Sequence, residues 1–358
     1  MKKKILISTG GSGGHVIPAT ILYDHLKEEF DTFMTIDRRG SQFLNIDKYK
    51  IEIFDVPKTP KNFFLLPFYI FSITYLIFKS FFLLKKKKIE ILISTGGYMS
   101  LPICMASKIF DIKLFLFEPN VVLGRSNKIF TKSSTKVFCY SKRIKNFSDR
   151  FKSKICLIPP LLRKSFYNIK KNEYSKINDE VKLLIIGGSQ GAKLFDTIIQ
   201  DSIIKISKKY KLKVLHQTTF NNFDNLKNFY LKNNIMYELF DFNEDISNYM
   251  SRSNMCITRA GASTLAELVF LNVPHIAIPL PIAKDNHQLE NALFYRELGC
   301  NWVFNQTEIT DAHFANKLVH IIENKDDYLN KKKNMKNFSY QNTWNNVNRK
   351  IITTINEN

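Results

Sequence analysis

Three glycine-rich turns in this sequence have residue types that could bind phosphate groups. They comprise residues Gly10–His15, Gly96–Tyr98 and Gly187–Lys193, and each follows a short apolar run. Glycine lets backbone N–H groups approach an anion closely, and the start of a following helix adds a favourable dipole. The sequence therefore predicts that phosphate or diphosphate groups bind at more than one place.

The first turn does not match the common nucleotide-binding fingerprints. A dinucleotide fingerprint needs a third glycine where Val16 stands, although Asp37 ends the next apolar run, where a ribose-binding acid would lie. A P-loop needs a lysine where His15 stands. His15 could instead act as a general base, donate a hydrogen bond to phosphate, or only begin the helix.

Another helix start follows the apolar run 255–258. Within Arg259–Glu267, Ser263 and Thr264 are common N-cap residues, and Glu267 lies three positions after Thr264. This spacing fits a capping box that only stabilises the helix. Alternatively, free N–H groups at the helix start hold a diphosphate, and Glu267 accepts hydrogen bonds from ribose hydroxyls.

The segment Pro279–Asn291 carries side chains that suit sugar hydroxyls. Its two prolines predict a rigid loop, and Asp285, His287, Gln288 and Asn291 follow them. Groups that recognise hydroxyls must be paired, because an unpaired buried polar group costs about 1–3 kcal/mol. The alternative interpretation is an ordinary polar helix start.

Short apolar runs must position all of these turns. Runs without alternation predict parallel strands that are buried on both faces. Pro159-Pro160 and the polar stretch 170–180 mark the approach to a second domain, and residues 312–358 predict polar helices. The predicted strands are 5–7, 32–36, 51–56, 89–94, 113–117, 136–139 and 155–158 in the first half, and 182–186, 213–217, 236–239, 255–258 and 275–278 in the second.

Composition narrows the function classes. A length of 358 residues predicts about two domains, and the net charge of +21 favours anionic partners. Basic residues are spread along the chain rather than clustered with aromatic platforms, so nucleic acid is not the expected partner.

The five cysteines show no C-x-x-C spacing, which predicts a reducing cytoplasm without disulfides or structural zinc. The apolar run after Lys4 is too short for a signal peptide.

An aromatic segment, Phe63–Leu84, is followed by the basic run Lys85–Lys88. Its length would permit a transmembrane helix, but Pro67 and Lys79 interrupt it and strand signals resume directly afterwards. A plain core helix is a second alternative. We expect a helical pair that lays an aromatic face on an anionic membrane surface through residues 63–88.

Together these motifs resemble one family over nearly the whole chain: the bacterial peptidoglycan glycosyltransferases that add N-acetylglucosamine to the undecaprenyl-diphosphate-linked muramyl pentapeptide. The order and spacing of the motifs carry the resemblance, since each motif alone is weak. The motifs are residues 10–15, 96–98, 187–192, 259–264 with Glu267, and 285–291.

The resemblance implies an α/β fold of the GT-B type, with two Rossmann-like domains facing an interdomain cleft. Residues 1–162 would form the acceptor- and membrane-binding domain, and residues 163–340 the domain that binds the UDP-sugar. The C-terminal helix, 341–358, would pack back on the first domain. The enzyme would be peripheral on the cytoplasmic face of the plasma membrane.

The resemblance also implies roles for particular residues. His15 would be the general base and Glu118 the reserve candidate, and neither a cofactor nor a metal ion is expected. The substrates would be UDP-N-acetylglucosamine and the undecaprenyl-diphosphate-linked acceptor, and the transfer would invert the anomeric configuration. By motif position the substrate-binding residues would be Ser12, Gly13, Gly14, Tyr98, Asn120, Arg163, Ser189, Gln190, Phe242, Ala262, Ser263, Thr264, Glu267, His287 and Gln288.

Two alternative functions stay open from the sequence. One is a UDP-sugar transferase that acts on another lipid, such as a diacylglycerol, since a membrane surface would serve it equally well. The other is a nicotinamide-dependent oxidoreductase, which needs the fingerprint that Val16 breaks.

Overall fold

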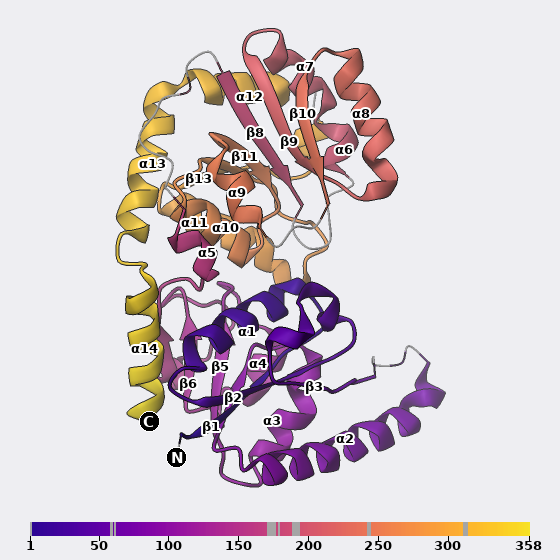
Figure 1. Cartoon of the computed structure of the whole chain (residues 1–358), viewed down its shortest axis with the longest axis vertical. Helices are drawn as coiled ribbons and strands as arrows, with labels where there is room; N and C mark the ends of the chain where they lie inside the picture. The colour runs from indigo at the N-terminus through magenta and orange to yellow at the C-terminus, as the bar shows by residue number, and fades with distance from the viewer. Residues whose placement is uncertain are drawn as a thin grey trace. The chain divides into compact units, whose positions relative to one another are not determined.

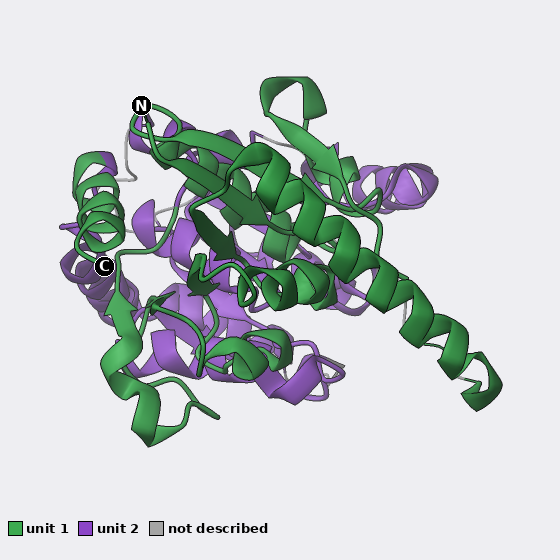
Figure 2. Cartoon of the chain, turned by 90° about the horizontal axis from the view of Figure 1, so that it is seen from below, with its two compact units in different colours: residues 1–161, 345–358 green, residues 162–344 purple. Residues whose placement is uncertain are grey.

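The chain forms two compact units. The computed structural model describes residues 2–57, 60, 62–169, 177, 180–187, 194–241, 245–310 and 314–358. Unit 1 comprises residues 1–161 and 345–358, and unit 2 comprises residues 162–344 (Figure 2). Each unit is built around one parallel sheet with helices on both faces, as the unalternating apolar runs predict (Figure 1).

The sheet of unit 1 has seven parallel strands in the order β3-β2-β1-β4-β5-β6-β7. Because the strand order reverses at β1, the carboxyl ends of β1 and β4 form a topological switch point, where open α/β sheets bind ligands. The first glycine turn follows β1 and the second follows β4. The strands are β1 (Lys4–Ser8), β2 (Asp31–Ile36), β3 (Ile51–Ile53), β4 (Ile91–Ser94), β5 (Lys113–Glu118), β6 (Lys136–Cys139) and β7 (Ile155–Leu157).

Helices cover both faces of this sheet because its side chains alternate between two apolar clusters. Ile5 and Ile7 of β1 lie in one cluster, and Leu6 lies in the other. The first cluster includes α1 (Gly13–Leu26) and α14 (Trp344–Asn356), and the second includes α2 (Leu66–Lys87) and α3 (Leu101–Ser107). A short helix, α4 (Arg125–Phe130), follows β5.

The sheet of unit 2 has six strands in the order β10-β9-β8-β11-β12-β13. Its switch point lies at the carboxyl ends of β8 and β11, where Gly187 directly follows β8 and Arg259 directly follows β11. The strands are β8 (Glu180–Ile186), β9 (Lys211–Gln217), β10 (Met236–Phe240), β11 (Met255–Thr258), β12 (His275–Ala277) and β13 (Asn301–Val303). The helices are α5 (Lys164–Tyr167), α6 (Phe195–Ile198), α7 (Gln200–Ser207), α8 (Phe223–Lys232), α9 (Ile246–Ser251), α10 (Ala262–Phe270), α11 (His287–Glu297), α12 (Phe314–Glu323) and α13 (Lys325–Ser339).

Each predicted strand overlaps one of the strands β1–β12, in order. The prediction omitted β13, which has three residues and begins with a polar side chain, so its sequence carries no apolar run. Asn301 is nevertheless buried, because its side-chain amide donates to Ala292 O at 3.3 Å. Pairing with β12, rather than local sequence, makes this segment a strand.

The aromatic segment is one helix, and the prediction of a helical pair was wrong. A 3₁₀ turn at Phe63–Leu65 leads into the 22-residue α2, and Pro67 lies in the first turn of that helix. Proline there breaks nothing, because the first helical N–H groups have no intrahelical acceptor. The interpretation as a core helix was also wrong, since the buried residues of α2 are Leu76, Ser80 and Leu84.

Phe63–Lys87 is long and apolar enough to cross a membrane, with mean hydropathy 1.6 and 11% of its apolar window buried. Among the described residues it is the one segment with these properties. The start of α2 projects beyond the other elements of unit 1 in Figure 2. Phe64, Phe68 and Phe71 there are 83%, 72% and 75% exposed.

The last helix completes the core of unit 1, which makes its contribution testable. Ile351 of α14 is fully buried in the cluster that contains Ile5 and Ile7. We expect Ile351→Ala to lower the free energy of unfolding by about 2–5 kcal/mol, because it leaves a cavity. Urea unfolding followed by circular dichroism measures the change. The matched control is Thr353→Ala on the exposed face of α14, which should stay within about 0.5 kcal/mol of the parent. Equal effects of the two substitutions would contradict the placement of α14.

Candidate active site

The two glycine turns of unit 1 meet at His15. His15 lies in the first turn of α1, and its Nδ1 is 2.8 Å from Thr95 O at the end of β4. A carbonyl oxygen only accepts, so Nδ1 carries the proton of the neutral imidazole and Nε2 keeps a lone pair. Gly96 has a φ of +88°, and a Cβ there would lie 3.5 Å from His15 Cε1. The second turn therefore packs closely on the imidazole.

The start of α1 offers unpaired backbone donors. Ser12 is the N-cap residue, and its hydroxyl makes no capping hydrogen bond. The first α-helical bond runs from Val16 N to Ser12 O at 3.1 Å. The N–H groups of Gly13 and Gly14 precede that bond, so they are free of an intrahelical acceptor and point out of the helix start. This is the geometry that a phosphate oxygen needs.

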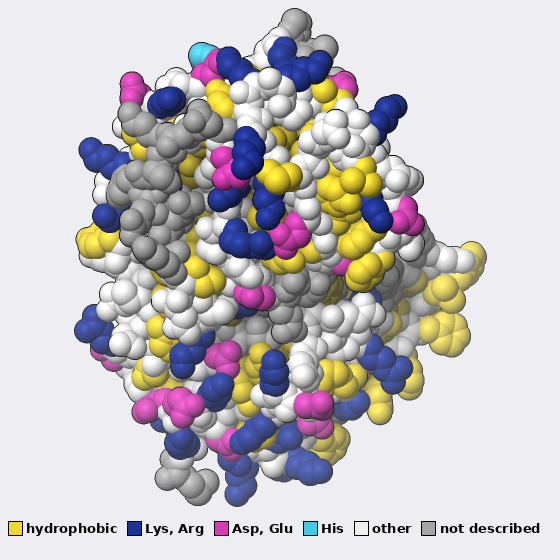
Figure 3. Space-filling model, turned by 45° about the horizontal axis from the view of Figure 1, so that its top comes forward, with side chains coloured by type: hydrophobic (Ala, Val, Ile, Leu, Met, Phe, Trp, Pro, Cys, Tyr) yellow, Lys and Arg dark blue, Asp and Glu magenta, His cyan; other side chains and the backbone are white. Residues whose placement is uncertain are grey.

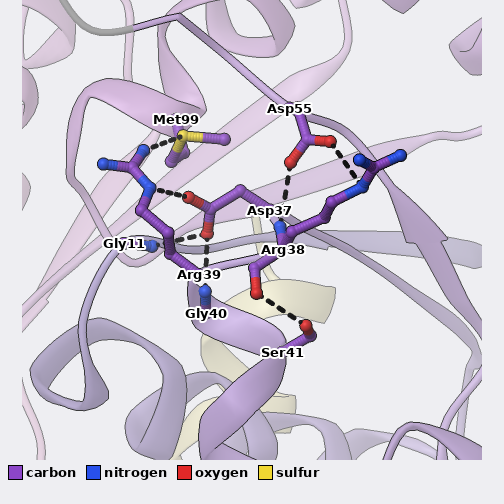
Figure 4. Close-up of polar contacts among 8 residues, drawn as sticks. All are labelled: Gly11, Asp37, Arg38, Arg39, Gly40, Ser41, Asp55 and Met99. Carbon is purple, nitrogen blue, oxygen red and sulfur yellow. Dashed lines mark hydrogen bonds and ion pairs between the residues drawn. The ribbon is translucent and has the colours of Figure 1, made fainter.

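Asp37 directly follows β2, at the position where a dinucleotide-binding protein has its ribose-binding acid, but here it supports the first turn from within the protein (Figure 4). Its Oδ1 accepts from Gly11 N at 2.7 Å and from Gly40 N at 2.9 Å. The residue is 1% exposed. A Cβ at Gly10 would come within 2.6 Å of Asp37 Oδ1, so this close approach requires glycine. Asp37 is therefore a structural acceptor that fixes the turn.

Glu118 and Asn120 lie together at the end of β5. Glu118 Oε1 accepts from Asn120 Nδ2 at 2.9 Å, and Oε2 accepts from Gly124 N at 2.7 Å and from Asn127 Nδ2 at 3.0 Å. Asn127 Nδ2 would also lie 3.3 Å from a Cβ on Gly96, so this amide connects Glu118 to the second glycine turn. The sequence analysis missed Asn127, since an asparagine inside a helix carries no distinctive pattern.

Tyr98 follows the second turn and ends beside the first. Its ring would lie 4.0 Å from a Cβ on Gly11, and the Arg39 guanidinium carbon lies 4.9 Å from the ring centroid. The Tyr98 hydroxyl is buried and has no hydrogen-bond partner among the described residues. A buried, unpaired hydroxyl beside two anion-binding turns is available to a ligand.

In unit 2, the capping-box interpretation of the α10 start was wrong. The N-cap is Gly261, and neither Ser263 nor Thr264 occupies that position. The first α-helical bond runs from Leu265 N to Gly261 O at 3.0 Å. The N–H groups of Ala262, Ser263 and Thr264 precede it, so three backbone donors lie at the switch point beside β11.

Glu267 lies in the second turn of α10 and pairs with a residue that is distant in sequence. Its Oε1 is 3.5 Å from Arg163 NH2, and Glu267 is 4% exposed. Burial raises the pKa of Glu267, and the Arg163 guanidinium opposes that change. The structure thus brings together two residues that were both predicted to bind substrate.

The loop after β12 is held by side chains that the sequence analysis assigned to sugar hydroxyls. Gln288 Oε1 accepts from Leu280 N at 3.0 Å, and buried Asn291 donates from Nδ2 to Ala260 O at 3.2 Å. His287 is partly buried at the start of α11, with Nδ1 2.7 Å from Lys284 O. Arg259 donates to Ile278 O and to Gln306 Oε1, so it links the segment that follows β12 to the segment that follows β13. Asn291 and Arg259 are positioning residues.

Ser189, Gln190 and Phe242 lie outside the described residues, and their assignments stay predictions. A buried polar cluster that was not predicted is formed around Asp196 in α6. Asp196 Oδ2 accepts from Thr218 Oγ1 at 2.8 Å, and Oδ1 lies 3.2 Å from His216 Nε2. Gly187 N donates to Gln217 Oε1 at 3.2 Å. The run His216–Thr218 at the end of β9 was the available signal.

Within the described ranges, no group of three or more His, Cys, Asp or Glu side chains has the arrangement of a metal site. In each unit, backbone donors lie at the carboxyl ends of strands, which is the arrangement expected for binding phosphate groups.

Two family models match the chain. The glycosyltransferase family 28 N-terminal domain matches residues 5–139, and the family 28 C-terminal domain matches residues 182–345. A protein of Pelagibacter ubique (strain HTCC1062) is 58% identical over 358 residues, which is 100% of both chains. A protein of Rickettsia canadensis (strain McKiel) is 34% identical over 90% of this chain and 91% of its own length. Both are named UDP-N-acetylglucosamine--N-acetylmuramyl-(pentapeptide) pyrophosphoryl-undecaprenol N-acetylglucosamine transferase.

Solved structures share the fold. Acinetobacter baumannii MurG matches with a TM-score of 0.75 at 22% identity, over 94% of this chain and 95% of that chain. Phytolacca americana UGT2, complexed with UDP-2fluoro-glucose and pterostilbene, matches with a TM-score of 0.69 at 12% identity, over 99% and 98%. These likenesses show the GT-B fold. With both family models matched in order and a full-length relative at 58% identity, the chain belongs to glycosyltransferase family 28 and is an N-acetylglucosaminyltransferase that uses UDP-N-acetylglucosamine.

Proposed function

We propose that this chain transfers N-acetylglucosamine from UDP-N-acetylglucosamine to the undecaprenyl-diphosphate-linked muramyl pentapeptide in peptidoglycan synthesis. The observation that carries the proposal is the 58% identity to the Pelagibacter ubique transferase over the full length of both chains. The product is the disaccharide-pentapeptide on the same lipid carrier.

Unit 2 binds the donor. The N–H groups of Ala262, Ser263 and Thr264 at the start of α10 donate to the diphosphate, which the positive end of the helix favours. Glu267 accepts hydrogen bonds from the ribose, and Arg163, 3.5 Å from its carboxylate, lies on the uracil side. His287 and Gln288 contact the sugar hydroxyls. Support comes from the three free N–H groups and from the pairing of Arg163 with the buried carboxylate of Glu267.

Unit 1 binds the acceptor diphosphate on its two glycine turns. The donors are the N–H groups of Gly13 and Gly14 and the hydroxyls of Ser12 and Tyr98. His15 takes the proton from the attacking muramyl hydroxyl, since Nε2 keeps the lone pair when Nδ1 donates to Thr95 O. The Glu118 carboxylate accepts four hydrogen bonds from within the protein. It therefore positions Asn120 rather than contacting the substrate itself.

The reaction inverts the anomeric carbon. The muramyl hydroxyl attacks from the face opposite to UDP, so the α-linked donor gives a β-linked product. Negative charge grows on the departing diphosphate, and the fixed donors at the start of α10 stabilise it. Removing one such fixed donor typically costs about 2.7–4 kcal/mol of transition-state stabilisation.

The enzyme sits peripherally on the cytoplasmic face of the plasma membrane, with α2 as its contact. The exposed aromatic side chains of α2 enter the bilayer, and Lys85–Lys88 meet anionic headgroups. Ser72 and Thr74 donate their hydroxyls to Phe68 O and Ile70 O at 2.8 and 2.9 Å, so these two hydroxyls are satisfied within the helix. The hydrophobic side chains at the right edge of Figure 3 lie where Figure 1 places the start of α2, while Lys and Arg are scattered over the face drawn.

His15→Ala is expected to lower kcat by roughly 10²–10⁴-fold, the usual contribution of a general base. Steady-state turnover with the lipid-linked acceptor measures this loss. The matched control, His320→Ala, changes an exposed histidine of unit 2 and should keep the parent rate. Parent turnover by His15→Ala would remove this residue from the proton transfer.

Glu267→Gln is expected to raise KM for UDP-N-acetylglucosamine by about tenfold or more, because the charge-assisted hydrogen bonds to the ribose and to Arg163 weaken. KM for the acceptor should stay unchanged. Glu297→Gln, on the exposed face of α11, is the control and should leave both constants at parent values. An unchanged donor KM in Glu267→Gln would contradict the ribose assignment.

Turnover on diacylglycerol in place of the lipid-linked acceptor would contradict the proposed substrate.

Phe68→Ser with Phe71→Ser is expected to weaken binding to vesicles of phosphatidylcholine and phosphatidylglycerol by at least about tenfold, since burying one Phe contributes about 1.5–3 kcal/mol. Vesicle co-sedimentation measures the binding, and turnover of a short-chain, water-soluble acceptor checks that the site is intact. Phe220→Ser in unit 2, at a side chain 72% exposed, is the matched control. Equal losses in the two proteins, or binding that ignores phosphatidylglycerol, would argue against α2 as the membrane contact.

A further inference from the structure

Arg39 lies beside the two glycine turns of unit 1, and the sequence analysis did not single it out (Figure 4). It follows β2, and its guanidinium is held from three sides. Arg39 Nε donates to Asp37 Oδ2 at 3.0 Å, and NH2 donates to Met99 Sδ at 3.7 Å. The guanidinium carbon lies 4.9 Å from the centroid of the Tyr98 ring. These contacts fix the orientation of a cation that is still 39% exposed.

The location of Asp37 creates an electrostatic problem for an anionic ligand. Asp37 is almost fully buried, and its Oδ1 lies 2.7 Å from Gly11 N in the first glycine turn. A diphosphate held on the same turn would face a fixed carboxylate of the same sign, at a place where water screens little. A binding site here needs a nearby cation, and Arg39 is ion-paired with this carboxylate.

The Arg39 guanidinium also has donors to spare. It carries five N–H groups, of which Nε–H contacts Asp37 and one on NH2 faces sulfur. Its NH1 makes no hydrogen bond among the residues that the structure describes. The buried hydroxyl of Tyr98, under the same guanidinium, likewise lacks a partner within those residues. Two kinds of unpaired donor therefore meet at the edge of the turn, and a planar guanidinium matches phosphate oxygens in a bidentate manner.

We propose that Arg39 is a specificity-determining residue that binds the diphosphate of the lipid-linked acceptor, while its Nε–H compensates the charge of Asp37. The inference rests on the proposed function, because it assumes that the acceptor diphosphate occupies the glycine turns of unit 1. Stacking on Tyr98 holds the guanidinium plane in place before the ligand arrives. The free NH1 edge and the Tyr98 hydroxyl then contact the phosphate oxygens.

The chain offers a matched control one residue away. Arg38 carries the same charge but is 84% exposed and pairs with Asp55, Nε to Oδ2 at 3.2 Å. Arg39→Gln and Arg38→Gln therefore remove the same charge from the same turn, and only the first removes the proposed contact. Arg39→Lys keeps the positive charge beside Asp37 but loses the planar fork. It serves as the second test variant if Arg39→Gln does not fold.

The test measures steady-state KM with a short-chain polyprenyl-diphosphate-linked muramyl pentapeptide. We expect Arg39→Gln to raise KM for this acceptor by about tenfold or more, and Arg39→Lys to raise it less. KM for UDP-N-acetylglucosamine should stay within about twofold, and Arg38→Gln should change neither constant by more than that. An acceptor KM at the parent value in both Arg39 variants overturns the inference, as does an equal rise in the two KM values.

Binding of inorganic pyrophosphate, measured by calorimetry, separates this inference from the proposed function. It needs no turnover, so it can be compared between the parent and the Arg39 variants even where the parent does not process the acceptor. Parent protein without turnover contradicts the proposed function. Pyrophosphate binding that is weaker in both Arg39 variants and unchanged in Arg38→Gln supports the role of Arg39, and binding that is equal in all four proteins overturns it.

Discussion

Backbone N–H groups at the carboxyl ends of parallel strands are the feature on which the functional part of this structure depends. Each sheet reverses its strand order once, at β1 and β4 in unit 1 and at β8 and β11 in unit 2. At these points neighbouring turns diverge and helix starts remain uncovered, so N–H groups stay available to an anion. The proposed donor and the proposed acceptor each carry a diphosphate, so two such places in one chain suit this reaction.

Keeping those N–H groups in place requires acceptors from within the protein. Asp37 holds the first turn through Gly11 N and Gly40 N, and Glu118 holds the loop after β5 through Gly124 N and Asn127. Both carboxylates are buried and ionisable, so each needs several donors to offset the cost of leaving water. The oxygens of Asp37 and Glu118 thus accept from backbone and side-chain donors of the protein, whereas Nε2 of His15 keeps an open lone pair.

Much of the fold followed from local sequence. Apolar runs without alternation predicted β1 to β12 because a strand buried on both faces must be apolar at every position. The same rule omitted β13, whose pairing with β12 buries Asn301. The prediction for α2 was wrong for another reason: Pro67 indicates a helix break unless it lies in the first turn, and the sequence alone did not place it there. Local pattern predicts what a segment prefers, and it does not predict which neighbour will satisfy its polar groups.

The sequence by itself determined the two parallel sheets, the positions of the glycine turns and the family, because these depend on residue type and order. Only the tertiary structure decided which partner each polar side chain takes. In the structure, Asp37 accepts a hydrogen bond from a glycine turn, and Glu267 pairs with Arg163 instead of capping a helix. The Arg39 guanidinium lies over the ring of Tyr98. The physical reason is that a hydrogen bond or ion pair depends on distance in space, and residues 104 positions apart, such as Arg163 and Glu267, become neighbours only when the sheet has formed.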